Sequence, residues 1–132
     1  MNLKEKLFLK AQSARENSYS PYSKFAVGSA IKFKNIDEIY SGCNIENGSF
    51  GATICAERVA IYKGISEIKK QSIEAILIIT SGDEGDYPCG LCLQTLSEFS
   101  NNDTTVYLAN PKEIKREFKF NDMMPYRFDF FK

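Results

Sequence analysis

Residues 73–80 read IEAILIIT, an almost unbroken run of apolar and mostly β-branched side chains. Such a run, without polar alternation, is typical of a strand that is buried on both faces of a sheet. Helical patterns flank it, one starting at Ile54 with a break near Gly64 and the other running from Cys89 to Phe99. Strands that alternate with helices in this way predict an α/β fold with three layers.

The segments further out complete this pattern. Residues 2–17 carry apolar side chains at helical spacing, and turn-forming residues follow them. Further strands are predicted over 25–33, 39–45, 104–109 and 114–120, with a hairpin connection at 35–38. Because the 132 residues contain no repeat, low-complexity tract or linker, we expect residues 1–132 to form a single domain.

The chain has 17 basic and 17 acidic residues, so its formal net charge is zero, and it contains four cysteines but no histidine. The absence of histidine excludes Ser-His-Asp and Cys-His nucleophiles and any imidazole metal site. The balanced charge argues against a nucleic-acid polymer as partner. Acid–base or metal chemistry therefore depends on Cys, Asp, Glu, Lys or Tyr.

The apolar segments are too short for a membrane span or for an export signal. The longest apolar run, residues 75–79, is far below the roughly 20 residues that cross a bilayer. The apolar stretch near the N-terminus is shorter and more interrupted than that of a signal peptide. We therefore expect a cytoplasmic protein with no membrane partner, whose cysteines serve metal binding or catalysis rather than disulfide bonds.

Three of the four cysteines lie where helices are predicted to begin: Cys55, Cys89 and Cys92. A helix N-terminus stabilises a thiolate, and thiolates bind zinc. Three thiolates leave one tetrahedral position open, which is typical of a catalytic zinc site rather than a structural one. We predict one zinc ion per chain, with a water molecule as fourth ligand that is acidic enough to supply hydroxide near neutral pH.

Two charged residues follow Cys55 closely in the sequence. Glu57 is placed to take a proton from that water and to hand it to a leaving group. Three thiolates leave the metal centre negatively charged, and Arg58 is placed to withdraw charge from the sulfurs. The sequence therefore predicts an acid–base group and a charge-balancing group beside the metal.

Two other uses of the cysteines remain open at this point. Cys43 could be the fourth ligand of a structural zinc site, although it lacks a paired cysteine nearby and lies within a predicted strand. Cys89 and Cys92 could form a redox dithiol, but this leaves Cys55 and Glu57 without a role. We favour Cys43 as a small, buried apolar residue.

The segment Cys55-Ala56-Glu57, followed by PCGLC at residues 88–92, resembles the motif of the zinc-dependent deaminases in its all-cysteine form. Two further blocks narrow the resemblance to the small homotetrameric cytidine deaminases. These blocks are YSPYSKF at residues 19–25 and GCNIEN at residues 42–47. The resemblance extends over about residues 10–128, in the same order and spacing.

This resemblance implies a three-layer α-β-α sandwich around a mixed five-stranded sheet. It also implies hydrolytic deamination of cytidine and deoxycytidine to uridine and deoxyuridine, with release of ammonia, as a step of pyrimidine salvage. Cys55, Cys89 and Cys92 would hold the zinc ion. Hydroxide from the zinc-bound water would attack C4 of the base, while Glu57 carries protons to ring N3 and to the leaving amino group.

The resemblance further implies the substrate contacts. Asn44 and Glu46 match a ribose-binding pair, and residues two apart share one face of a strand, here expected to be a central strand. Phe25 matches an aromatic residue beside the pyrimidine ring, and the main chain of Ala56 matches a group that contacts the base. Phe128 matches a phenylalanine that reaches into a neighbouring subunit's site, which implies a homotetramer with shared sites.

The chain departs from the family pattern at a few positions. Phe50 replaces a common tyrosine, Leu93 replaces a common arginine, and Met123-Met124 replace a common pair of leucines. Loss of the arginine leaves Arg58 with more of the charge balance at the zinc. Another aminated heterocycle, such as a blasticidin-like antibiotic, is therefore kept as an alternative substrate, and it would not need the ribose-binding pair.

Overall fold

Strand β3 (Ile73–Ile79) lies at the centre of a five-stranded sheet, as its apolar sequence predicts. The structure, a computed structural model, describes residues 1–129. The other strands are β1 (Gly28–Phe33), β2 (Ile39–Cys43), β4 (Thr105–Ala109) and β5 (Ile114–Lys119), and their order in the sheet is β2-β1-β3-β4-β5. The helices are α1 (Leu3–Arg15), α2 (Ala56–Ile68), α3 (Gly90–Phe99), α4 (Phe120–Met123) and the 3-10 helix η1 (Phe50–Ala52).

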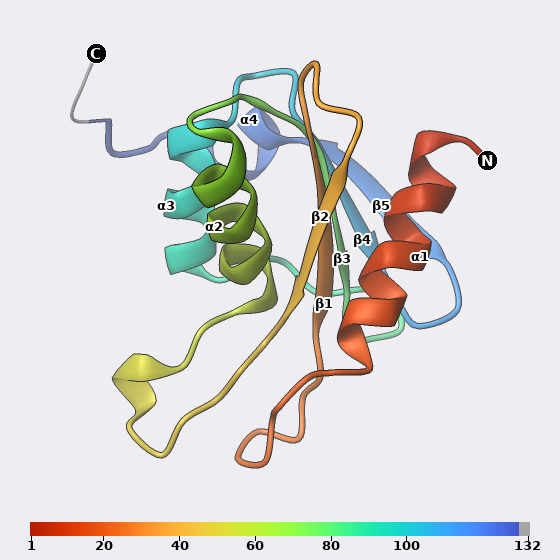
Figure 1. The fold of residues 1–132 in the computed structure, drawn as a ribbon, viewed down its shortest axis with the longest axis vertical. Coiled ribbons are helices and arrows are strands. Elements are labelled where there is room, and N and C mark those ends of the chain that lie inside the picture. Colours follow the sequence, from red (N-terminus) through yellow and green to blue (C-terminus); the bar gives the residue numbers. More distant parts are fainter. Residues whose placement is uncertain (130–132) are drawn as a thin grey trace.

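The sheet is mixed and is covered by helices on both faces. Strand β1 is antiparallel to β2 and β3, β3 is parallel to β4, and β4 is antiparallel to β5. Figure 1 shows α1 on one face of the sheet and α2 with α3 on the other. Ile76 and Ile78 pack into the core under α2 and α3, while Leu77 and Ile79 pack into the core under α1. The predicted three-layer sandwich and its doubly buried central strand are confirmed.

The connections between strands bring the starts of α2 and α3 to the same edge of the sheet. Strands β2 and β3 are both antiparallel to β1, so they run in the same direction, and α2 connects them. Helix α3 connects β3 to the parallel strand β4. A crossover helix begins where the preceding strand ends, so both helices begin beyond the carboxyl ends of strands, where α/β proteins commonly bind ligands.

Helix α2 is continuous through Gly64, so the predicted break at this position is wrong. Gly64 is buried, and a Cβ atom there would lie 2.4 Å from a ring carbon of Phe33 on β1. The glycine therefore lets the helix approach the sheet closely instead of ending it.

Strands β1 and β2 are both shorter than predicted, because the ladder between them ends at Gly28 and Cys43, and Ile45 forms isolated bridges with Tyr19 and Ile54 instead. The main-chain N–H of Val27 donates to Oδ1 of Asn44 over 2.9 Å. Strand β2 ends at Cys43 and lies at the edge of the sheet. The expectation that Asn44 and Glu46 share a face of a central strand is therefore wrong.

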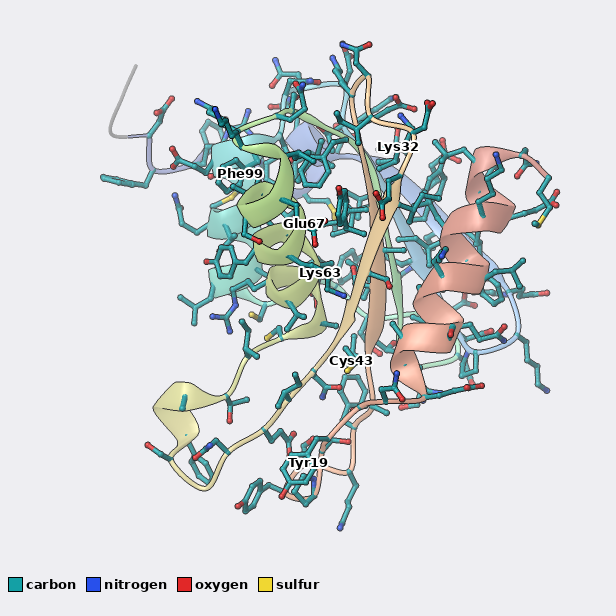
Figure 2. All side chains as sticks on the ribbon, viewed as in Figure 1. Tyr19, Lys32, Cys43, Lys63, Glu67 and Phe99 are labelled. Carbon is teal, nitrogen blue, oxygen red and sulfur yellow. The ribbon has the colours of Figure 1, made fainter. Side chains whose placement is uncertain are left out.

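Helix α2 is fastened to β2 by polar side chains as well as by its apolar face. Lys63 and Glu67 point from α2 toward β2 in Figure 2. The Lys63 ammonium donates to the main-chain carbonyl of Ser41, and Glu67 lies near Tyr40, where it adds to the effect of burial and of Glu38 in raising the pKa of that phenol. These contacts fix how α2 lies on the sheet, and thereby where its first residues are placed. Within residues 1–129, no helix is long and apolar enough to cross a membrane.

Candidate active site

Three cysteine sulfurs meet where α2 and α3 begin. Cys55 is the N-cap residue of α2, Cys89 is the N-cap residue of α3, and Cys92 lies in the first turn of α3. Their Sγ atoms all lie within 4.8 Å of one another, and the Cys55 and Cys89 sulfurs are 3.7 Å apart. Neither N-cap thiol forms a side-chain capping hydrogen bond. The sequence prediction that these cysteines converge is confirmed.

The arrangement of the sulfurs fits a zinc ion. Tetrahedral zinc with Zn–S bonds of about 2.3 Å separates its sulfur ligands by about 3.8 Å, close to the 3.7 Å between Cys55 and Cys89. Cys92 is buried and Cys89 is exposed, so the group opens to one side. Among the described residues, Cys43 is buried on β2 and outside this group. A structural site with four cysteines is therefore not formed.

The Cys55 and Cys92 thiols differ in their pKa values. Hydrogen bonding with Cys92, aided by Arg58 and Cys89, lowers the pKa of the Cys55 thiol to about 5. The same hydrogen bond, together with burial, raises the pKa of Cys92. Arg58 Nη2 lies 3.7 Å from Cys55 Sγ. The arginine thus lies beside the sulfur whose pKa is lowered, and its contact contributes to that lowering.

Glu57 is a buried carboxyl group in the first turn of α2, with 5% of its surface exposed. Burial raises its pKa to about 7, and the nearby Cys55 thiolate adds to this effect. A carboxyl group with a pKa near neutrality can both accept and donate a proton at physiological pH. Its environment therefore suits acid–base chemistry beside the three sulfurs.

A cleft of about 220 Å³ lies against these groups. It brings together predicted residues from four segments of the chain, whereas Cys92, Arg58 and Phe128 are not part of its lining. Its lining consists of Phe25, Val27, Asn44, Glu46, Thr53, Ile54, Cys55, Ala56, Glu57, Ile78, Thr80, Asp86, Tyr87 and Cys89.

The sequence analysis missed the part of the lining that follows β3. Thr80 is the first residue after that strand, and its hydroxyl donates to the carboxylate of Asp86 over 2.5 Å. Tyr87 completes this side of the cleft. The position of Thr80 at the carboxyl end of a central strand was the available signal, because ligand sites of α/β folds gather at that edge.

The side-chain amide of Asn44 forms hydrogen bonds with the segment that carries Phe25 through both its oxygen and its nitrogen. Its Oδ1 accepts from Val27 N–H over 2.9 Å and from the Ser18 hydroxyl over 2.5 Å. Its Nδ2 donates to the Phe25 carbonyl over 2.7 Å. Since an amide nitrogen carries two donors, the second N–H of Asn44 can serve a ligand. Asn44 therefore builds the cleft wall in addition to lining the cleft.

Glu46 organises the neighbouring turn in a similar way. One carboxylate oxygen accepts from the main-chain N–H groups of Tyr22 and Ser23, at 2.9 and 3.1 Å, and the other accepts from the Ser23 hydroxyl. The hydroxyl contact, followed by the main-chain bonds, lowers the pKa of Glu46 below its ordinary value of 4.5. Glu46 thus enters the cleft as a carboxylate.

Of four remaining predicted positions, Ala56 lines the cleft and Phe50, Leu93 and Phe128 do not. Ala56 opens α2 and lines the cleft, and Leu93 packs partly buried against the core. Phe50 is 76% exposed and packs edge-on against Tyr22, with ring centroids 5.9 Å apart. Phe128 is 68% exposed and lies beside α3, where Gln94 Nε2 donates to its carbonyl over 3.4 Å.

The chain is similar in sequence and structure to a group of known proteins. A family model described as "Cytidine and deoxycytidylate deaminase zinc-binding region" matches residues 1–109. A cytidine deaminase of Sporosarcina psychrophila is 40% identical over 121 residues, which cover 92% of this chain and 88% of that protein. A cytidine deaminase of Halalkalibacterium halodurans is 38% identical over 122 residues, or 92% and 91% of the two chains.

Solved structures agree with the sequence relatives. A cytidine deaminase from Burkholderia pseudomallei superposes with a TM-score of 0.89 at 32% identity, covering 97% of this chain and all of that one (100%). A cytidine deaminase from Mycobacterium tuberculosis superposes with a TM-score of 0.80 at 28% identity, covering 98% and 99%.

Proposed function

The chain belongs to the zinc-binding cytidine and deoxycytidylate deaminase family, and from that membership we propose that it deaminates cytidine and deoxycytidine hydrolytically to uridine and deoxyuridine, with release of ammonia. The observation that carries this proposal is the meeting of three thiols and a buried carboxyl group beside one cleft. Few reactions of a small ligand need this set of groups together.

Cys55, Cys89 and Cys92 would hold the zinc ion, which when bound lowers the pKa of a water molecule and so supplies the nucleophile. Glu57 would accept one proton from the attacking water and pass it to ring N3, and would then take the second proton from the new hydroxyl group at C4 and pass it to the departing amino nitrogen, which leaves as ammonia. Its burial at the cleft and its pKa of about 7 suit a group that must accept a proton and release it again. Arg58 donates toward Cys55 Sγ and offsets part of the thiolate charge.

The polar lining of the cleft supports a nucleoside as substrate. We assign binding of the sugar hydroxyls to the second N–H of Asn44 and to the carboxylate of Glu46. Phe25 would pack against the face of the pyrimidine ring, and the main chain of Ala56 would contact the base. The described lining contains three carboxyl groups, those of Glu46, Glu57 and Asp86, and neither lysine nor arginine. A phosphate group would meet repulsion there, so a neutral nucleoside fits better than a nucleotide.

The proposal extends to the assembly and its location. Phe128 lies outside the cleft of its own chain and is largely exposed, as a residue that completes a neighbouring subunit's site would be. We therefore include a homotetramer with shared sites in the proposal. A cytoplasmic location agrees with the four cysteines, all of which are free thiols.

The test is the ultraviolet absorbance change on adding cytidine to the purified protein, with and without prior chelation. We expect turnover by the zinc-replete protein, its loss on chelation, and its return with added zinc. Zinc analysis should give about one ion per chain, in accord with a three-thiolate site. Zinc-replete protein that leaves the cytidine spectrum unchanged would contradict the proposal.

A substrate panel separates this reaction from its closest alternative. Cytidine, deoxycytidine, free cytosine and a blasticidin-like antibiotic are compared by kcat/KM. A nucleoside deaminase should strongly prefer the two nucleosides, because free cytosine leaves the polar groups of Asn44 and Glu46 without sugar partners. Preference for the antibiotic would assign the same zinc chemistry to another heterocycle.

A further inference from the structure

Arg116, on the edge strand β5, holds the β3–α3 loop (residues 80–89) through three hydrogen bonds. Its Nε donates to the carbonyl of Glu84 and its Nη2 to the carbonyl of Gly85, each over 3.1 Å. Its Nη1 donates to the hydroxyl of Tyr87 over 2.8 Å. One side chain therefore binds main-chain and side-chain acceptors from three residues of the same loop.

The aromatic ring of Tyr87 is held as well. The guanidinium carbon of Arg116 lies 4.6 Å from the centroid of this ring, a distance at which the cation attracts the ring. The same ring packs against Phe118 of β5, with centroids 5.8 Å apart and planes inclined by 48°. Tyr87 is 58% exposed, so these contacts with β5 fix its orientation although it lies at the surface.

The loop also approaches β4 closely, next to Arg116. Gly85 has a φ of +76°, and a Cβ atom there would lie 3.0 Å from both Leu108 Cβ and Ala109 N. Leu108 pairs with Arg116 in the β4–β5 register. The close approach that glycine permits thus brings the Gly85 carbonyl to the guanidinium group.

This loop forms one wall of the substrate cleft. Asp86 and Tyr87 line the cleft, and the loop ends at Cys89. Arg116 does not line the cleft itself. Through its bonds to Glu84, Gly85 and Tyr87, it acts on that wall from outside.

We propose that Arg116 is a positioning residue for the deamination, fixing the wall formed by Asp86 and Tyr87 before the substrate arrives. The inference rests on the proposed function. Without Arg116, part of the binding energy of the nucleoside is spent on ordering the loop, so the substrate binds more weakly. Arginine is required because its rigid fork reaches three acceptors at once, whereas a lysine ammonium acts as a single point charge on a flexible stem.

The test compares Arg116→Gln with the wild-type enzyme, and Lys119→Gln serves as the matched control. Lys119 lies on the same strand, and its described bonds go to Asp103 and Thr105, away from the loop. We expect Arg116→Gln to raise the KM for cytidine about ten-fold, with kcat per bound zinc within about two-fold of wild type. Arg116→Lys should recover little of the loss, and Lys119→Gln should match wild type.

Amide hydrogen exchange provides a readout that does not depend on turnover. The peptide covering residues 80–89 should exchange at least about ten-fold faster in Arg116→Gln, while peptides from α1 keep their wild-type rates. Unchanged KM and unchanged loop exchange would overturn the inference. Failure of the wild-type enzyme to deaminate cytidine would instead contradict the proposed function, and the exchange result distinguishes the two.

A double-mutant cycle with Tyr87→Leu tests whether the two residues act together. If Arg116 acts partly through Tyr87, the double variant should raise KM by clearly less than the product of the two single effects. Effects that multiply would overturn this mechanism. Tyr87→Phe removes only the hydroxyl group that accepts from Arg116 and should raise the KM for cytidine about two- to three-fold. This small change still tests the Arg116–Tyr87 contact if the larger substitutions impair folding.

Discussion

Two sets of groups at the cleft are held in place in different ways. One set, the helix-start cluster, is placed by main-chain structure and comprises Cys55, Glu57, Cys89 and Cys92. The other set, the loop wall, is held by hydrogen bonds from individual side chains and comprises Phe25, Asn44, Glu46, Asp86 and Tyr87. The fold itself therefore positions the groups to which we assign the chemistry, whereas single polar contacts position the groups to which we assign substrate binding. Substitutions should separate the two: changes in the cluster affect zinc and kcat, and changes in the wall affect KM and local stability.

The largest effect is expected from Cys92→Ala. Cys92 is the buried member of the sulfur group, so its loss removes one of the three proposed zinc ligands. We expect zinc content to fall well below one per chain and activity to drop by more than about 10³-fold. Metal analysis and the absorbance assay measure both. Cys43→Ala is the control and should keep its zinc. Full zinc occupancy in Cys92→Ala would contradict the assignment of Cys92 as a metal ligand.

Glu57→Gln should separate chemistry from metal binding. The substitution preserves shape but removes the group that moves protons, so kcat should fall about 10²- to 10⁴-fold. Zinc content should stay at the wild-type level, because Glu57 is not among the three sulfur ligands. Near-normal turnover in this variant would exclude Glu57 as the acid–base group.

The helix-start cluster could be predicted from the sequence because its placement depends on local pattern and topology. The cysteine spacing places thiols at two helix starts, and parallel crossovers bring those starts together. The loop wall could not be predicted in the same way. Asn44 bonds to residues 17 to 26 positions away in the sequence, and no periodic pattern encodes such contacts. Gly64 was misread for a related reason, since its neighbour Phe33 lies on another element.

Asn44→Ala should affect the loop wall most strongly. It leaves the Val27 N–H and the Phe25 carbonyl without their partner, and Val27 is buried. We expect the free energy of unfolding to fall by about 1–3 kcal/mol. Denaturant unfolding measures this loss, and the KM for cytidine should rise in parallel while zinc content is kept.

Asn47→Ala is the matched control for this substitution. Asn47 is exposed, and its side chain accepts from Ser49 N–H within the same loop. Its replacement should change stability by less than about 0.5 kcal/mol. Equal losses of stability in the two variants would contradict the role assigned to the hydrogen bonds of Asn44.

The smallest effect concerns Glu46 and pH. Because hydrogen bonds lower its pKa in the folded state, the carboxylate stabilises the protein above the ordinary pKa of 4.5. That contribution disappears as the pH falls through the lowered folded-state pKa. Thermal unfolding of wild type and Glu46→Gln should therefore differ near pH 7 and converge in acid. A constant difference between the two across this range would contradict the assignment.

The sulfur group has a consequence for the unfolded chain. Cys55 and Cys89 are 34 residues apart in the sequence, and α2 and β3 lie between them. A metal ion bound to both would close this segment into a ring, much as a disulfide does, and cross-links of this span remove about 4 kcal/mol of chain entropy from the unfolded state. The ion would thus tie a helix and the central strand together, so that chelation weakens the sandwich as well as stopping the reaction.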